Sequence, residues 1–216
     1  MRTKHARLAL LAGAAGAIAG GTAVRASIHF DEGLRRMMPS ILLWGAFFIY
    51  WGIASRDRGA DEQSESGGSA QFHQLMLGLA LLLLLLPVSG LVQRWLPKAA
   101  LWPGVSIQAG FFALAIWARR HLGKNWSAEV RIAVDHKLVR TGPYRHLRHP
   151  IYSAMLGMFA GTAVSSGEVH SLVALALLAV LYVRKTRLEE QILGRTFGDE
   201  YDAYRRDSWA LIPLVY

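Results

Sequence analysis

The sequence predicts an all-α, polytopic integral membrane protein, and three observations support this fold class. Of the 216 residues, 53% are hydrophobic, and they gather in successive apolar runs separated by polar stretches. No Lys or Arg falls within these runs, as a hydrocarbon environment favours. The basic residues are concentrated in alternate connections between the runs, which is typical of multi-pass proteins. About six transmembrane segments are expected, the last two of them forming a C-terminal helical hairpin.

The N-terminal half contains four apolar runs, at residues 8–24, 39–55, 71–92 and 101–118. The first run follows a basic start and is rich in Gly and Ala, so a cleaved signal peptide is the competing interpretation. The third includes six consecutive leucines and is the clearest transmembrane signal. Residues 29–38 are expected to form a polar break and residues 56–70 a flexible hydrophilic loop.

Two shorter apolar runs, 150–165 and 172–183, predict the hairpin. At about 1.5 Å rise per residue, each is slightly short for a hydrocarbon core of about 30 Å. The helices are therefore expected to extend beyond the runs, and the second to continue into residues 184–194. Three aromatic residues beyond this point recur at helical spacing and predict an amphipathic C-terminal helix: Phe197, Tyr201 and Tyr204.

The charge distribution sets the orientation. With the N-terminus inside, the inside segments carry 19 of the 24 Lys and Arg residues, and residues 119–148 lie on the cytoplasmic face. The formal net charge of +9 therefore fits juxtamembrane basic clusters facing membrane lipids, not nucleic acid. The chain has no Cys, which excludes disulfides, thiolate nucleophiles and Cys-ligated metals. We expect a multi-pass protein of the bacterial inner membrane.

Residues 136–152, HKLVRTGPYRHLRHPIY, are basic, aromatic and rich in turn formers. Pro150 suits the first turn of a helix, and a helix N-terminus presents free N–H groups to an anion. Farther along, Lys185 and Glu189 are four residues apart and share a helix face. An ordinary surface ion pair explains them on spacing alone, but an acid beside this basic segment also suits a cationic ligand group. A small zwitterionic ligand at the membrane surface fits both features.

Residues 125–213 resemble the isoprenylcysteine carboxyl methyltransferases and the related phospholipid methyltransferases. The resemblance is carried by His136-x-Leu138-Val139, Gly142-Pro143-Tyr144, Arg148-His149-Pro150-x-Tyr152, Glu189-Glu190 and Phe197-Gly198-x-x-Tyr201-x-x-Tyr204. It implies S-adenosyl-L-methionine as cofactor, N-terminal transmembrane helices over residues 1–118 and a catalytic region with a cofactor pocket over residues 119–216.

The resemblance also implies roles for individual residues. Lys185 and Glu189 fall at catalytic positions, although the family has an arginine that holds the substrate carboxylate where this chain has Lys185; Arg184 or Arg187 is an alternative contact. The family has an upstream glutamine contact, which Arg131 or Glu129 replaces here. The implied cofactor contacts are Arg131, His136, Lys137, Leu138, Val139, Tyr144, His149, Pro150, Ile151, Tyr152, Glu189 and Glu190.

The predicted function is methyl transfer to a lipophilic acceptor at the cytoplasmic face. The acceptor is either a carboxylate, isoprenylcysteine-like, or a lipid head group. One alternative is an NADPH-dependent reductase resembling the sterol reductases, and another is a non-enzymatic, lipid-binding membrane scaffold. No metal site is expected, because three His without Cys or a nearby acid favour hydrogen-bonding roles: His136, His146 and His149. The oligomeric state stays open.

Overall fold

Helices make up most of the described chain. The structure, a computed structural model, describes residues 33–54, 67–85, 96–123 and 138–214, with side chains from residue 75 in the second range. The long helices are Gly33–Ala54, α2 (Gly67–Leu85), α3 (Leu101–Leu122), α4 (Pro150–Ser166) and α5 (Val169–Phe197). Shorter elements are η2 (Lys98–Ala100), η4 (Gly142–Arg145) and α6 (Asp199–Arg206). These residues contain no named strand, so the all-α class is confirmed.

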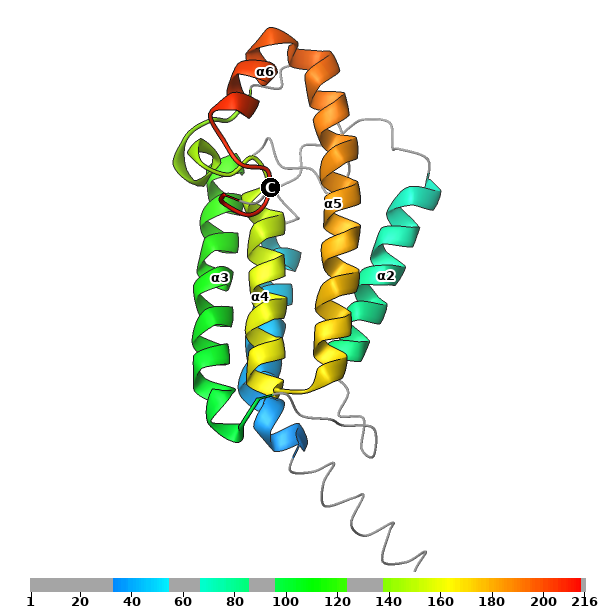
Figure 1. Cartoon of the computed structure of the whole chain (residues 1–216), viewed down its shortest axis with the longest axis vertical. Coiled ribbons are helices and arrows are strands. Elements are labelled where there is room, and N and C mark those ends of the chain that lie inside the picture. Colours follow the sequence, from blue (N-terminus) through cyan, green and yellow to red (C-terminus); the bar gives the residue numbers. More distant parts are fainter. Residues whose placement is uncertain (1–32, 55–66, 86–95, 124–137, 215–216) are drawn as a thin grey trace, which may run out of the picture.

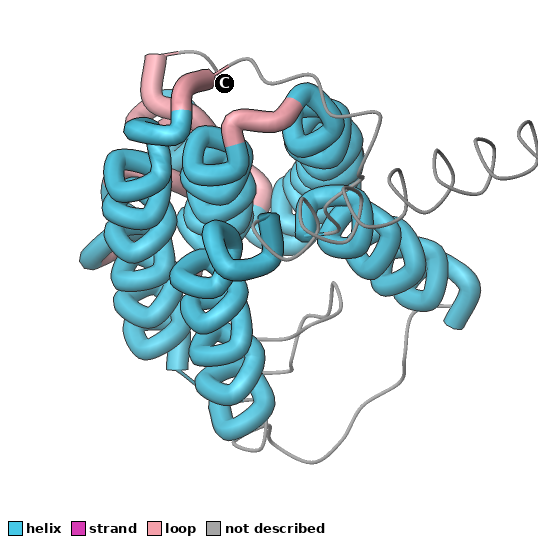
Figure 2. Tube along the Cα trace, turned by 90° about the horizontal axis from the view of Figure 1, so that it is seen from below, coloured by secondary structure: helices cyan, strands magenta, loops and turns pink. Residues whose placement is uncertain are grey.

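The long helices stand side by side, and α6 lies across one end of the bundle (Figure 1). Figure 2 shows the helices of the bundle from below, and in Figure 1 α4 lies between α3 and α5. Its burial agrees, because 12 of its 17 residues are buried. The helix is therefore held on several sides, which fixes the position of its N-terminus at the α6 end.

The predicted hairpin is confirmed. Gly167 ends α4 with φ +64°, a left-handed conformation that glycine adopts without a steric penalty. Two residues later α5 begins, and it runs for 29 residues, well past its apolar run. The predicted continuation into residues 184–194 is therefore correct. The predicted C-terminal helix is interrupted, however, because Gly198 with φ +50° separates α5 from α6.

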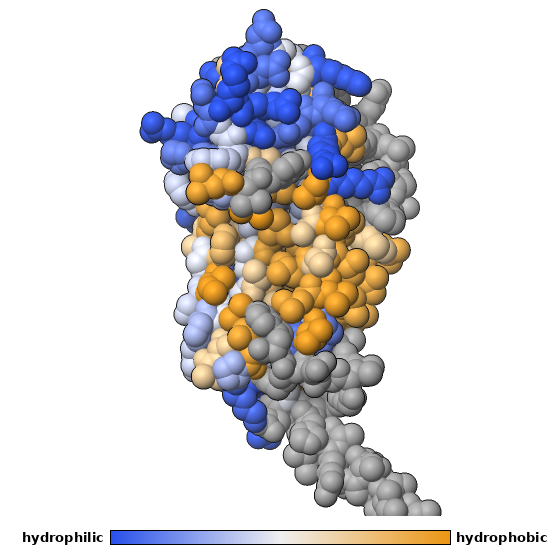
Figure 3. All heavy atoms as spheres, in the orientation of Figure 1, coloured by the Kyte–Doolittle hydropathy of each residue, from blue (hydrophilic) through white to orange (hydrophobic). Residues whose placement is uncertain are grey.

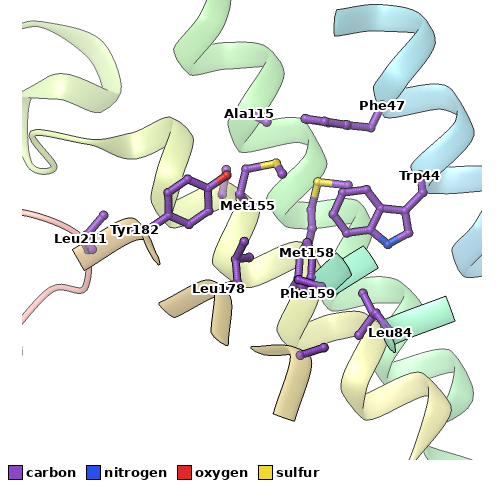
Figure 4. Packing of buried hydrophobic residues seen from close by; sticks show 13 residues of the cluster. Trp44, Phe47, Leu84, Ala115, Met155, Met158, Phe159, Leu178, Tyr182 and Leu211 are labelled. Atoms are coloured by element: carbon purple, nitrogen blue, oxygen red, sulfur yellow. The ribbon is translucent and has the colours of Figure 1, made fainter. Parts of the chain in front are cut away.

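The core joins the hairpin to the N-terminal helices (Figure 4). Trp44 and Phe159 meet edge to face with their ring centroids 5.1 Å apart. Polar groups add directional contacts: Nε1 of Trp44 donates to Oγ1 of Thr162 (3.1 Å), and Nε2 of Gln108 donates to the carbonyl of Ser40 (3.1 Å). Such bonds hold helices together in lipid, where burial of apolar surface gives no net driving force between them.

Within the described ranges, three helices are long and apolar enough to cross a membrane: Gly33–Ala54, Lys98–Leu122 and Val169–Phe197. On the face shown in Figure 3, apolar side chains cover much of the middle of the bundle, and a hydrophilic region covers the α6 end. The chain is thus a membrane protein. The predicted run 8–24 lies outside the described residues, so the six-span count stays a prediction. The predicted division between N-terminal helices (residues 1–118) and a catalytic region (residues 119–216) also stays a prediction. Residue 118 falls within α3.

Two predicted boundaries are wrong. Residues 33–38 were expected in a polar break, and residues 67–70 in a loop, but both segments are helical. A helix that leaves the hydrocarbon core keeps its own backbone hydrogen bonds, so an apolar run marks the membrane and not the helix end.

Candidate active site

The predicted site residues that the structure describes gather at the hydrophilic end of the bundle. We call this end the polar cap; it comprises residues 138–149, residues 184–197 of α5, α6 and residues 207–212. The turn η4 leads into His149, which is the N-cap of α4, and Pro150 occupies the first helical turn. Proline is pre-organised for that position. As a result, the basic segment of the sequence ends where the apolar helix α4 begins.

Glu189 of α5 contacts two residues at the start of α4: Tyr152 and the N-cap residue His149. The hydroxyl of Tyr152 donates to Oε1 of Glu189, and Nδ1 of His149 lies 3.2 Å from Oε2. The side chain of Glu189 is 16% exposed. A carboxylate with both oxygens engaged from one side is fixed in orientation, and the positive end of α4 stabilises its charge. Two segments separated by about forty residues thus form one acidic site.

A column of rings connects this acid to the core. The rings of His149 and Tyr152 are nearly parallel, with centroids 5.6 Å apart, and those of Tyr152 and Tyr182 are 4.7 Å apart. Tyr182 is 3% exposed and belongs to the apolar core. Nζ of Lys185 lies 5.5 Å from the centre of the Tyr152 ring. This geometry allows a cation–π contact, and it places Lys185 beside Glu189.

Glu190 shares His149 with Glu189, since its Oε1 lies 3.6 Å from Nε2 of His149, but it also faces two arginines. Its Oε1 accepts a hydrogen bond from Nε of Arg148 at 2.6 Å, and its Oε2 lies 3.9 Å from Nε of Arg205. Nη1 of Arg148 also donates to the carbonyls of Ser208 and Arg205. Glu190 therefore links α5 to the segment that precedes α4 and to α6. Its assignment to the cofactor stays a prediction.

Tyr144 packs between α3 and α6 within the polar cap. It is 6% exposed, its ring stacks at 6.4 Å on that of His121, and its carbonyl accepts a hydrogen bond from the hydroxyl of Tyr204. Burial raises the pKa of Tyr144 well above its ordinary value, so the phenol stays protonated at neutral pH. Tyr201 and Tyr204 are both buried, as expected for the apolar face of an amphipathic helix.

The structure brings together five of the predicted residues in direct contact: His149, Tyr152, Lys185, Glu189 and Glu190. Pro150 is buried. Three further predicted contacts are half-buried: Leu138, Val139 and Ile151. Tyr144 lies in the adjoining turn η4. The predicted contacts Arg131, His136 and Lys137 lie outside the described residues. Their roles stay predictions.

Sequence reasoning missed Tyr182 and Arg205. Tyr182 had a detectable signal, since Tyr182, Lys185 and Glu189 are spaced three and four apart and so share one face of a helix. Arg205 had none, because its partner Glu190 is fifteen positions away and the turn at Gly198 brings them together.

The charge of His149 depends on its two acidic neighbours. Burial alone lowers the pKa of His149, but the contact with Glu189 and the negative charges of Glu189 and Glu190 outweigh it and raise the pKa above its ordinary value. A raised pKa in the folded state means that the folded protein binds the proton more tightly than the unfolded chain does. The resulting stabilisation is complete below pH 6.5 and is lost as the pH rises through the folded-state pKa.

We therefore expect the melting temperature of the wild type to fall, relative to His149→Gln, as the pH rises from about 5 to about 9. His146→Gln is the control, because His146 belongs to the same segment but has an exposed side chain. Melting curves in detergent at each pH measure the difference. A wild-type profile parallel to that of His149→Gln would contradict the coupling.

Comparisons with known proteins identify similar sequences and a similar fold. Residues 99–200 match the family described as Phospholipid methyltransferase. A probable protein-S-isoprenylcysteine O-methyltransferase of Oryza sativa subsp. indica is 33% identical over 96 residues, which is 43% of this chain and 50% of that protein. A protein-S-isoprenylcysteine O-methyltransferase of Schizosaccharomyces pombe is 34% identical over 82 residues, 38% of this chain and 35% of that protein. The chain thus spans half or less of the length of these relatives.

The fold has a solved counterpart. The structure of the eukaryotic intramembrane Ras methyltransferase, isoprenylcysteine carboxyl methyltransferase, superposes with a TM-score of 0.55 at 16% identity, covering 89% of this chain and 75% of that one. At this identity the likeness concerns the fold alone. With the sequence matches, it confirms the resemblance drawn from the motifs: this chain is a membrane protein like the isoprenylcysteine carboxyl and phospholipid methyltransferases.

Proposed function

We propose that the protein transfers the methyl group of S-adenosyl-L-methionine to a lipophilic acceptor at the cytoplasmic face of the membrane. One observation carries the proposal. The two segments to which the resemblance assigns the cofactor meet at the end of an apolar bundle, through the contacts of Tyr152 and His149 with Glu189. A scaffold that only binds lipid does not require an acid held in this orientation.

The residues of the cap fit the cofactor's chemistry. S-adenosyl-L-methionine carries an ammonium, a carboxylate and a sulfonium, and the sulfonium makes its methyl group electrophilic. Glu189 is partly exposed and suits either cation. The N–H groups of Ile151 and Tyr152 are in the first turn of α4, where a helix has no acceptor for them, and they suit the carboxylate. We further propose contacts from Leu138, Val139 and Tyr144, and from Arg131, His136 and Lys137, which lie outside the described residues.

The chain's own residues then position the acceptor. A carboxylate acceptor is ionised near neutral pH and needs no general base. Lys185, beside Glu189 and over the Tyr152 ring, suits the acceptor's negative charge. Nearer the middle of the bundle, α5 also carries exposed apolar side chains such as Val180, which is 69% exposed, and these suit an apolar chain. Alignment of the two reactants and exclusion of water supply the catalytic effect. A lipid head group is the second acceptor class.

A binding titration tests the proposal. S-adenosylmethionine, S-adenosylhomocysteine and NADPH are offered separately to the detergent-purified protein, and heat or melting temperature is followed. We expect saturable binding of the two adenosyl compounds and none of NADPH. Binding of NADPH alone would identify a reductase. Binding of none by a folded protein would favour a lipid-binding scaffold.

Lys185→Arg is expected to retain or increase methyl transfer to a carboxylate acceptor, because guanidinium binds a carboxylate with two parallel hydrogen bonds where ammonium offers a point charge. Lys185→Met should lower it, and Arg195→Met, at an exposed residue farther along α5, should not. The assay compares transfer to a prenylated cysteine and to a lipid head group. Loss of activity in Lys185→Arg would show that the amine itself is required.

A further inference from the structure

The chain after α6 is tied to the start of α4. We call residues 207–214 the strap. The backbone N–H of Arg148 donates to the carbonyl of Trp209 (2.8 Å), that of His149 to the carbonyl of Ala210 (3.1 Å), and that of Trp209 to the carbonyl of His146 (3.0 Å). Oγ of Ser153 donates to the carbonyl of Leu211. The strap therefore holds the backbone of the histidine that contacts Glu189.

The other side of the strap is apolar and exposed. Trp209 is 39% exposed, Ile212 48% and Leu214 86%, while Ala210 and Leu211 between them are buried. The strap, at the red end of the chain in Figure 1, lies near the level where the hydrophilic end of the molecule meets the apolar side chains of its middle (Figure 3). Tryptophan and aliphatic residues at this level are typical of chains lying in the lipid head-group layer.

A basic depression adjoins the strap. It is open, has a volume of about 360 Å³ and is lined by Arg148, Asp202, Arg205 and Arg206. Arg148 is engaged by Glu190, but Arg206 is exposed and forms no ion pair with any residue in the described ranges. Asp202 offsets one of the three cations, since its Oδ1 lies 4.0 Å from Nη1 of Arg205. The depression keeps a net positive charge, and guanidinium groups suit a phosphate.

We propose that the strap docks in the head-group layer of the membrane, with its apolar side chains in lipid and the arginine-lined depression on the phosphate of an anionic lipid. The two features are complementary, because the exposed apolar residues and the depression flank the same short segment. Docking would fix the strap and thereby the backbone of Arg148 and His149. This consequence for the site rests on the proposed function, whereas the docking itself does not.

The absence of Cys from the chain makes a direct test available. Ile212→Cys and, separately, Leu214→Cys are labelled with an environment-sensitive dye in nanodiscs that contain lipids spin-labelled at the head group. Thr196→Cys is the control, because Thr196 is exposed in the polar cap near the end of α5. We expect strong quenching at either strap position and weak quenching at Thr196. Quenching at the strap equal to that at Thr196 would overturn the docking.

The phosphate partner is tested with the same dye. Phosphatidylglycerol is titrated into phosphatidylcholine nanodiscs, and the mole fraction that gives half of the spectral shift is measured. Arg206→Gln should raise it about fivefold, the effect of one basic residue near an anionic surface, while Arg195→Gln, exposed on α5, should leave it unchanged. Equal shifts in both variants would overturn the assignment of the depression. So would an equal response to inorganic phosphate in detergent, because the ligand would then be a free anion.

These readouts need neither cofactor nor methyl transfer. If the strap docks but no adenosyl compound binds, the proposed function fails and the docking stands. If the adenosyl compounds bind but the dye stays in water, the docking fails and the proposed function stands.

Discussion

Glu189→Gln should lower the affinity for S-adenosylmethionine by about 10- to 150-fold, since a hydrogen bond to a charged group contributes about 1.5–3 kcal/mol. Glutamine keeps the shape of the side chain and an acceptor for the hydroxyl of Tyr152. It removes the negative charge that faces the cofactor's cations. Calorimetric titration of the detergent-purified variant measures the loss directly.

The control is Glu200→Gln in the same cap. Its carboxylate pairs with Arg140 at 3.3 Å, but its side chain is 52% exposed, and such pairs contribute little. We expect its affinity to stay within about twofold of the wild type. Comparable losses in both variants would contradict the assignment of Glu189.

S-adenosylhomocysteine adds a finer distinction, because it keeps the ammonium of the cofactor and lacks the sulfonium. If Glu189 binds the ammonium, Glu189→Gln weakens both compounds by the same factor. If Glu189 faces the sulfonium, it weakens S-adenosylmethionine more. Either result identifies which cation the carboxylate holds.

The sequence was informative where short-range rules decide the structure. Apolar runs located the hairpin, proline located the start of α4, and charge patterning located the polar cap. The family resemblance assigned Tyr152 and Glu189 to the same cofactor, but their direct contact is seen only in the structure. No spacing rule relates these two residues, since they lie on different helices.

The contacts that sequence reasoning could not reach depend on the path of the backbone. Glu190 meets Arg148 because α5 extends past the apolar run alongside the start of α4. The strap meets residues 146–149 through backbone hydrogen bonds. Every residue carries these backbone groups, so the identity of the residues does not predict the contact. Adjacent acids with the same charge thus acquire different surroundings, Glu189 beside Tyr152 and Glu190 beside two arginines.

The contact between α3 and α4 gives the second large prediction, because the two backbones touch at small residues. A Cβ on Gly104 would lie 2.5 Å from the carbonyl oxygen of Gly161 and 2.7 Å from Cα of Ser165. Since these are backbone atoms, no side chain can move aside, and the helices must separate. We expect Gly104→Ala to lower the free energy of unfolding by about 1–3 kcal/mol. Thermal and denaturant unfolding in detergent measure it.

Gly110→Ala in the same helix should instead raise the free energy of unfolding. A Cβ there meets nothing within 4 Å, and replacing glycine by alanine inside a helix otherwise stabilises by about 0.5–1 kcal/mol. The same substitution in one helix should therefore destabilise at residue 104 and stabilise at residue 110. A gain at both would show that α3 and α4 do not touch there. A loss at residue 104 that also weakens binding of S-adenosylhomocysteine would connect this interface, far from the cap, to the position of His149 at the other end of α4.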